Sequence, residues 1–229
     1  MRIGGGRAIG LVLAALVAAL VVDRAVPGSH LVVGLGLTAG LVVIARVLGH
    51  TAADLGLARS TVPAGLRWGA VAAALVGAAY TLIYLIALVT PVREVLPDGE
   101  NDIRRTLWAA LVVIPLGTVV PEELAFRGLL PALLERRHGV VAATVASSGL
   151  FGLWHVLASL GGGAANAAIA DVVGSDAAGT VVRVIATVGF TSLAGLVLCG
   201  LRLRSGSLLA PVLAHWTVNG LGVVMILLA

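Results

Sequence analysis

Three hydrophobic stretches of the sequence carry polar or aromatic side chains at spacings that share one face of a helix. The residues concerned are Glu122, Glu123, Arg127, Phe151, His155, His215 and Asn219. Carboxylates and imidazoles can activate water, bind metal ions or carry protons. A charged side chain at the centre of a membrane helix costs at least ~2.5 kcal/mol, so it persists where it faces protein or water and has a partner. These residue types therefore indicate chemistry inside a membrane.

The first stretch reads PEELAFRG and lies within an apolar run over 107–134. Glu123 and Arg127 are four residues apart, so they share a helix face and we expect an ion pair between them. Glu122 points about 100° away from that face and has no counterion on its own helix. Helix stability does not explain its presence.

Two prolines, Pro115 and Pro121, lie close to these acids. Each proline removes a backbone hydrogen bond, so we expect a kink that opens a wet cavity. A second interpretation is that Pro121 begins a separate helix. Glu122 and Glu123 would then lie in the positive first turn of that helix, near the membrane interface.

The second and third stretches contain FGLWH and HWTVN. A single histidine beside Trp154 is also typical of a helix end at the membrane interface. His215 and Asn219 lie four residues apart and face one side of a helix, where plain helix-to-helix hydrogen bonding would explain them as well.

The depths of the three groups in the membrane are compatible with a common site. Counted from one membrane side at 1.5 Å per residue, Glu122 lies ~18 Å deep, His155 ~24 Å and His215 ~12 Å. These values bracket the midplane. Convergence is therefore permitted, although the depths alone do not demonstrate it.

The composition requires a membrane setting for these residues. Of 229 residues, 59% are hydrophobic and 11% charged, against about 25% charged in soluble domains. A soluble globule and a disordered chain are therefore excluded. The single cysteine, Cys199, excludes a disulfide framework and any Cys-rich metal site. The basic residues are all arginines, placed singly or in pairs between apolar runs, so we expect no nucleic-acid partner.

We predict an all-α fold, a polytopic transmembrane helix bundle of about seven spans. The predicted spans cover residues 8–22, 31–48, 66–89, 107–134, 139–158, 180–201 and 207–228. We divide the chain into N-terminal transmembrane helices over 1–105 and a catalytic transmembrane core over 106–229. The first span is interpreted as a retained anchor, and residues 161–179 as an outer loop, either a plain connector or a lid. The distribution of arginines favours a cytoplasmic N-terminus.

In this order, Glu122-Glu123-x-x-x-Arg127, Phe151-x-x-x-His155 and His215-x-x-x-Asn219 resemble the three motifs of the CPBP family, which comprises CAAX prenyl proteases and bacteriocin-processing (Abi) intramembrane proteases. The resemblance covers about 107–228. The GSLLAP segment before His215 and the segment Leu55-Gly56-Leu57 are also similar to family features.

The resemblance implies hydrolysis of a peptide bond inside the membrane. Glu122 and His155 would activate the water, and His215 with Asn219 would stabilise the oxyanion or complete a ligand set. Glu123 and Arg127 would hold the helix, and Phe151 would pack beside the water.

The motifs leave the use of a metal open. Glu122, His155 and His215 make a plausible zinc set, whereas a desolvated carboxylate could act as a base without metal. Against zinc, none of these three candidates shares a helix with another.

The expected substrate is a membrane-anchored peptide or protein, either a prenylated CAAX-like tail or a leader peptide. The expected setting is a multi-pass protein in the bilayer of a prokaryotic-type cell membrane, with the oligomeric state left open. Two other functions remain alternatives: a non-catalytic membrane binding or immunity-type protein, and a proton-coupled transporter.

Overall fold

The computed structural model describes residues 5–89, 102–160 and 174–228, and within these ranges the regular structure is entirely helical. The elements are α1 Gly5–Ala25, α2 His30–Val47, η1 Arg59–Thr61, α3 Val62–Val89, α4 Ile103–Trp108, η3 Ala109–Val119, α5 Val120–Glu123, η4 Leu124–Leu129, α6 Leu130–Trp154, α7 Val156–Ser159, α9 Ala177–Ser205 and α10 Leu209–Leu228. The predicted outer loop over 161–179 falls mostly outside the described residues.

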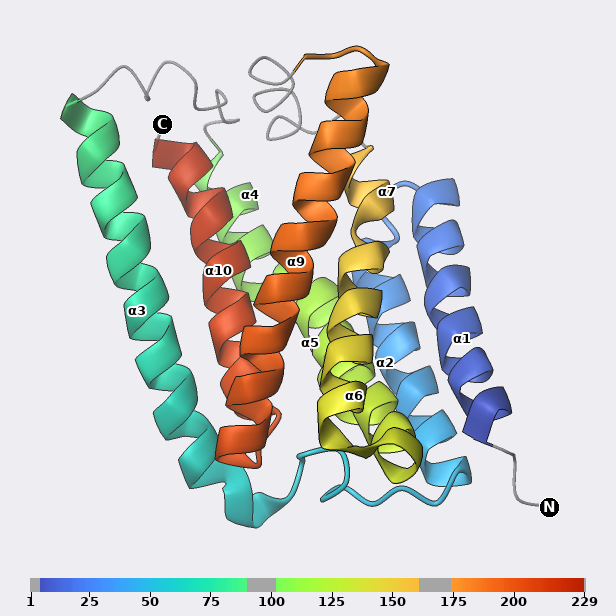
Figure 1. The fold of residues 1–229 in the computed structure, drawn as a ribbon. Helices are drawn as coiled ribbons and strands as arrows, with labels where there is room; N and C mark the ends of the chain where they lie inside the picture. Colours follow the sequence, from blue (N-terminus) through green and yellow to red (C-terminus); the bar gives the residue numbers. More distant parts are fainter. Residues whose placement is uncertain (1–4, 90–101, 161–173, 229) are drawn as a thin grey trace.

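Six helical stretches of the described chain are long and apolar enough to cross a membrane. The fourth, Ile103–Ser159, has 57 residues, whereas one crossing needs about 20. It reverses direction at Gly139, whose backbone (φ 79°, ψ 167°) is not helical. Figure 1 shows the two antiparallel halves, with α4 and α5 in green before the turn and the part of α6 after the turn in yellow. The all-α polytopic bundle is therefore confirmed, with seven crossings when this turn is counted.

The helix that carries the acids is continuous but widened. The backbone N–H of Val120 donates to the carbonyl of Pro115, and that of Leu130 to the carbonyl of Ala125, both across five residues. Such π-helical turns often occur at functional sites. Pro121 lies within this continuous helix, so it does not begin a separate one. The expected loss of regular hydrogen bonding near the acids therefore takes the form of wide turns.

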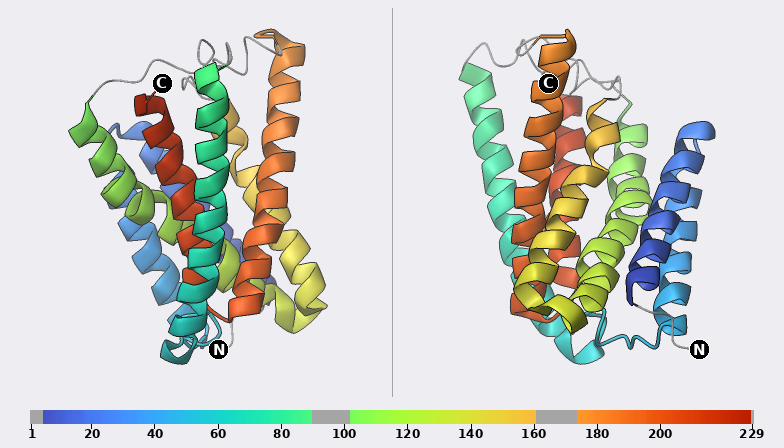
Figure 2. Two further views of the ribbon diagram at one scale, coloured as in Figure 1. Left: turned by 90° about the vertical axis from the view of Figure 1, so that its left-hand side faces the viewer. Right: turned by 45° about the vertical axis from the view of Figure 1, so that its right-hand side comes forward.

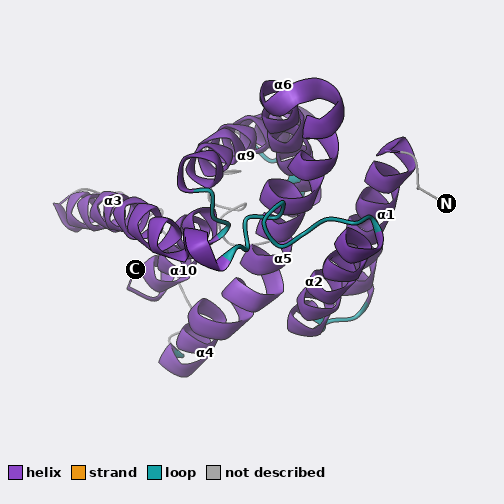
Figure 3. Cartoon of the chain, turned by 90° about the horizontal axis from the view of Figure 1, so that it is seen from below, coloured by secondary structure: helices purple, strands orange, loops and turns teal. Residues whose placement is uncertain are grey.

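The helices pack in pairs around the acid-bearing helix. α10 packs on α3, α9 packs on α6, and α2 packs on η3 with α1 beside it. Figure 2 shows this arrangement from the side, and Figure 3, from below, shows α5 surrounded by the other helices. Residues 121–130 of the acid-bearing helix are all buried, while apolar side chains such as Leu75 and Phe190 remain exposed on the outer surface, as in an integral membrane protein.

One glycine contact fixes the approach of α2 to this central helix. A side chain at Gly34 would collide with the backbone of Gly117, so the two helices touch backbone to backbone there. Gly36 and Gly40 of the same helix face open space.

Candidate active site

The two acids of the first motif lie in different environments. Glu123 and Arg127 form the expected ion pair, with Oε1 of Glu123 at 3.0 Å from Nη1 of Arg127, and neither side chain is exposed. The same oxygen accepts a hydrogen bond from Nδ1 of His215 at 2.7 Å. The buried carboxylate of Glu123 thus connects the acid-bearing helix to α10, which lies 92 residues further along the chain.

Arg127 also contacts the second motif. Its guanidinium lies 3.9 Å from the centroid of the Phe151 ring, within the range of a cation–π interaction. The Phe151 ring in turn meets the rings of Phe126, His155 and His215 edge to face, at 5.3, 4.6 and 5.9 Å between centroids. Phe151 therefore contacts the buried guanidinium of Arg127 and the rings of both histidines.

Glu122 has one engaged and one unengaged oxygen. Nε1 of Trp154 donates to Oε1 at 2.8 Å. Oε2 is buried and has no hydrogen-bond partner among the described residues, and Nε2 of His215 lies 3.9 Å from it. A buried polar oxygen without a partner is costly, so this atom is suited to hold a water molecule.

The orientation of His155 follows from a break in its helix. α6 ends at Trp154, and the backbone N–H of His155 donates to the carbonyl of Gly152 at 3.1 Å rather than to that of Phe151. The released carbonyl of Phe151 accepts a hydrogen bond from Nδ1 of His155 at 2.7 Å. This bond fixes the tautomer, because Nδ1 carries the hydrogen and Nε2 keeps its lone pair. A histidine in this state can accept a proton from water.

His215 differs in one respect from the expectation. Its Nδ1 faces the carboxylate of Glu123, which can only accept, so the hydrogen of the neutral ring lies on that nitrogen. Nε2 then accepts a hydrogen bond from Nδ2 of Asn219 at 3.1 Å. The ring N–H that we expected to face a substrate oxygen is directed at Glu123 instead, and the donor left for such an oxygen is the second amide hydrogen of Asn219.

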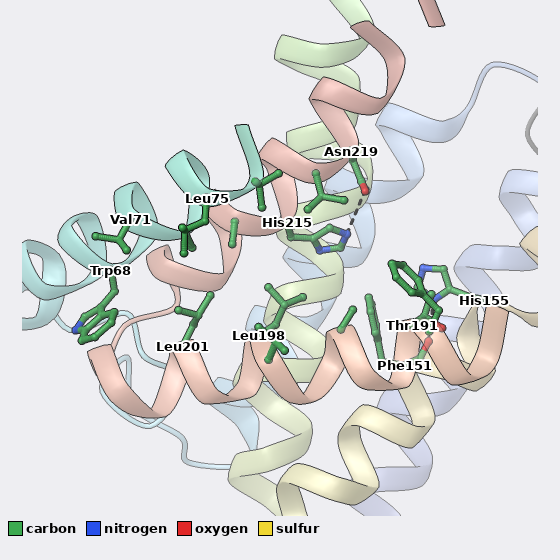
Figure 4. A pocket seen from close by; sticks show the side chains of 17 residues that line it. Trp68, Val71, Leu75, Phe151, His155, Thr191, Leu198, Leu201, His215 and Asn219 are labelled. Atoms are coloured by element: carbon green, nitrogen blue, oxygen red, sulfur yellow. Dashed lines mark hydrogen bonds between the residues drawn. The ribbon is translucent and has the colours of Figure 1, made fainter. Parts of the chain in front are cut away.

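Two cavities meet at these residues. The first, called here the apolar cavity, has a volume of about 500 Å³ and lies between α3, α6, α9 and α10. Figure 4 shows Phe151 and His155 at one end of it, His215 and Asn219 beside them, and Trp68 at the opposite end.

The second, called here the polar cavity, has a volume of about 270 Å³ and is lined by Glu122, Trp154 and His155, with Asp23, Arg24 and His30 further out. His155 lines both cavities, and the structure thus brings Glu122 and His155 to one space.

Sequence reasoning missed two groups that line the polar cavity. Trp154 entered the sequence argument only as the neighbour of His155, whereas its indole N–H donates a hydrogen bond to Glu122. His30 bonds Asp23 through Nδ1 at 3.0 Å and Thr118 through Nε2 at 2.8 Å. Thr118 lies four residues before Glu122, one turn away on a helix, and this spacing was the available signal.

The residues proposed as zinc ligands do not form a metal site in this arrangement. No group of three or more His, Cys, Asp and Glu side chains in the described part of the chain is placed to hold one ion. Both ring nitrogens of His215 are engaged, by Glu123 and by Asn219. We therefore derive no catalytic step through a metal.

Comparison with known proteins adds to this geometry. A family model described as type II CAAX prenyl endopeptidase Rce1-like matches residues 104–221, which is slightly more than half of the chain. No curated protein and no solved structure matches the chain. The matched segment begins in α4 and ends in α10, so it contains all seven motif residues. The chain belongs to the Rce1-like type II CAAX prenyl endopeptidase family of membrane proteins.

Proposed function

We propose that the protein is an intramembrane endopeptidase that hydrolyses a peptide bond in a membrane-anchored peptide, using water activated by Glu122 and His155. The observation that carries this proposal is the unengaged Oε2 of Glu122, buried beside a cavity that His155 also lines. Oε2 of Glu123 is also buried without a hydrogen-bond partner among the described residues, but Glu123 does not line the polar cavity. What distinguishes Glu122 is therefore that its free oxygen lies beside a cavity that can supply water. Membership of the family supports the same reaction class.

The proposed reaction begins with a water molecule between Glu122 and His155. Oε2 of Glu122 takes a proton as the water oxygen attacks the carbonyl carbon of the scissile peptide bond, while Nε2 of His155 accepts a hydrogen bond from the other water hydrogen. A tetrahedral intermediate with a negatively charged oxygen results. When it collapses, the carbon–nitrogen bond breaks and the proton passes from Glu122 to the leaving amine.

We assign stabilisation of the oxyanion to Asn219, held in place by His215. Nδ2 of Asn219 uses one hydrogen on Nε2 of His215 and keeps the other for the substrate oxygen. A fixed neutral donor suits this task because it needs no reorganisation when charge develops. Glu123, Arg127 and Phe151 act as positioning residues, since they fix His215 and the helix break that orients His155.

The apolar cavity supports a substrate with a hydrocarbon chain. Leu75, Phe190 and Val197 line it and are 65% or more exposed, so the cavity opens on the lipid-facing surface. A prenyl chain attached to a CAAX-like tail can enter there from the bilayer and place the adjacent peptide bond near His155. The polar cavity on the other side of His155 supplies water. A leader peptide with an apolar segment would use the same entrance.

Both halves of the chain contribute to this site. The core over 106–229 supplies the seven motif residues, and the helices of 1–105 supply walls, with α3 along the apolar cavity and α1 and α2 along the polar cavity. We propose that the first half selects the substrate and limits access of water, while the second half performs the chemistry.

The test is cleavage of a farnesylated CAAX-type peptide by the full-length protein in lipid vesicles, followed by mass spectrometry of the products. Glu122→Gln should abolish cleavage while the protein remains folded and inserted, because the amide cannot take the proton. The matched control is Asp176→Asn, an equally small change at an exposed residue that caps α9. A non-catalytic protein or a transporter would give no cleavage by wild type, and cleavage by Glu122→Gln at the wild-type rate would exclude the proposed role of Glu122.

A further inference from the structure

A third cavity lies on the membrane side at which α1 begins, away from the apolar and polar cavities. It has a volume of about 500 Å³ and is called here the arginine pocket. Its charged and titratable lining residues are His50, Asp54, Arg127, Glu135, Arg136 and Arg202. The mechanism above uses one of these residues, Arg127, as a positioning residue through its contacts with Glu123 and Phe151.

Unengaged hydrogen-bond donors gather around this pocket. Nδ1 of His50, Nε and Nη2 of Arg127, and Nε of Arg202 are buried and have no hydrogen-bond partner among the described residues. The side chain of Arg127 is 0% exposed and that of His50 is 2% exposed. The thiol of Cys199 lies beside Arg127, but sulfur is a weak acceptor. Buried guanidinium donors need acceptors, so the unengaged nitrogens of Arg127 and Arg202 point to a ligand that accepts several hydrogen bonds. Nδ1 of His50 can add a further donor in one tautomer of its ring.

The acidic residues of the pocket do not meet this need. The carboxylate of Asp54 accepts from the backbone N–H and hydroxyl of Thr51 at 2.7 and 2.9 Å, and the backbone bond is the main reason why its pKa lies below the usual value. Its Oδ2 is 3.9 Å from Nδ1 of His50, beyond hydrogen-bond reach. Glu135 is exposed and acts on Arg202 through its charge, but Nε of Arg202 still has no hydrogen-bond partner among the described residues.

The electrostatic surroundings of the pocket favour an anion. Arg136 and Arg202 bring permanent positive charge to the pocket. Burial, followed by the charge of Arg136, lowers the pKa of His50, so this ring contributes as a neutral hydrogen-bonding group. Nη2 of Arg202 is anchored on the carbonyl of Asp54 at 3.3 Å, so its guanidinium is held over the pocket.

The whole membrane side around the pocket is rich in arginine. Among the described residues it carries Arg7, Arg46, Arg59, Arg67, Arg136, Arg137, Arg202 and Arg204, against the acids Asp54 and Glu135. This is the distribution that cytoplasmic membrane surfaces show, where anionic lipid headgroups are available.

We propose that the arginine pocket binds a phosphate group, supplied by the headgroup of an anionic phospholipid or by a free phosphate ester. Three guanidinium groups and one imidazole surround the phosphate oxygens, which only accept hydrogen bonds. Arg127 then has a partner on each side, the phosphate in the pocket and Glu123 toward the active site. Binding itself is independent of the proposed function, and an effect on cleavage through Arg127, Glu123 and His215 rests on it.

The experiment measures lipid binding by native mass spectrometry of the full-length protein in a neutral detergent, titrated with phosphatidylglycerol or phosphatidylcholine. We expect phosphatidylglycerol to bind at least tenfold more tightly. Arg202→Gln should weaken that binding at least tenfold, whereas Arg204→Gln, a control on the same helix whose guanidinium lies over Trp68 at 4.9 Å, should change it less than twofold. If Arg202→Gln does not fold, the exposed Arg136 serves as the second variant, Arg136→Gln, with a loss of at least threefold.

Competition with inorganic phosphate distinguishes the sources. Displacement of the lipid by millimolar phosphate supports a site for the phosphate group itself, and lack of displacement supports a site for the lipid headgroup. Equal binding of both lipids, or equal binding by wild type, Arg202→Gln and Arg136→Gln, would show that water alone satisfies these donors and would overturn the proposal. Because the readout is binding, the result does not depend on whether Glu122→Gln abolishes cleavage.

Discussion

Replacing Arg127 by methionine should destabilise the folded protein far more than the same change at Arg204. Both guanidinium groups lie over an aromatic ring, at 3.9 Å from Phe151 and at 4.9 Å from Trp68. Arg127 is in addition the partner of a buried carboxylate, whereas Arg204 is exposed. The pair of variants therefore separates the ion pair from the stacking contact.

The magnitude follows from the burial of Glu123. Removing one partner of a fully buried ion pair costs roughly 3–5 kcal/mol, because the other charge stays buried and uncompensated. His215 still donates to Oε1 of Glu123 at 2.7 Å, so we expect the lower end, about 3 kcal/mol, or about a hundredfold in the unfolding equilibrium. Arg204→Met should cost less than about 1 kcal/mol, the usual value of an exposed cation–π contact.

The assay is reversible unfolding in mixed micelles with an increasing fraction of denaturing detergent, followed by far-ultraviolet circular dichroism. A third variant, Glu123→Gln with Arg127→Met, removes both charges and should be more stable than Arg127→Met alone, because no buried charge is left without a partner. Equal losses of stability for Arg127→Met and Arg204→Met would refute the argument from buried charge. A double variant that is no more stable than Arg127→Met alone would refute it as well.

Four further outcomes are expected. Asn219→Ala should reduce kcat by about 10²–10³-fold with little change in KM, the usual loss for one oxyanion donor, and a change confined to KM would count against that role. Chelators should leave cleavage intact, whereas complete inactivation that zinc restores would mean that the resting arrangement opens to bind metal. Gly34→Val should lower the yield of folded protein, because the added carbons would collide with the backbone at Gly117, while Gly36→Val, which faces open space, should not. The hydrogen bond from Thr51 to Asp54 lowers the pKa of that acid, so its contribution to stability is present above pH about 4 and is lost as the pH falls through the lowered pKa. The protection of the Thr51 amide relative to its intrinsic exchange rate should therefore fall there in wild type and show no such step in Asp54→Asn.

The spans and the local ion pair could be predicted from the sequence because they depend on neighbouring residues. The predicted span 31–48 coincides with α2 His30–Val47 within one residue at each end. α3 begins at Val62, earlier than the predicted residue 66, because Pro63 is compatible with a first helical turn and Arg67 can reach the membrane surface from inside the helix. Glu123 and Arg127 meet because a helix fixes residues four apart.

The contacts between distant segments could not be predicted in this way. The bond from His215 to Glu123 joins residues 92 apart, and the bond from Trp154 to Glu122 joins residues 32 apart. Both depend on how helices rotate against one another, and the π-helical turns near Pro115 change that rotation without a periodic signal in the sequence. The tautomer of His155 likewise depends on a helix break at the histidine itself.

The opening of the apolar cavity on the lipid-facing surface has a consequence for kinetics. A substrate that enters there is dissolved in two dimensions, so its effective concentration is its mole fraction in the bilayer rather than its amount per volume of buffer. When substrate-free vesicles fuse with the reaction vesicles, the mole fraction of substrate in the bilayer falls. Cleavage should therefore slow, although the total amounts of protein and peptide in the sample are unchanged. The rate of water delivery through the polar cavity would be unaffected by this dilution, since bulk water remains at the same activity.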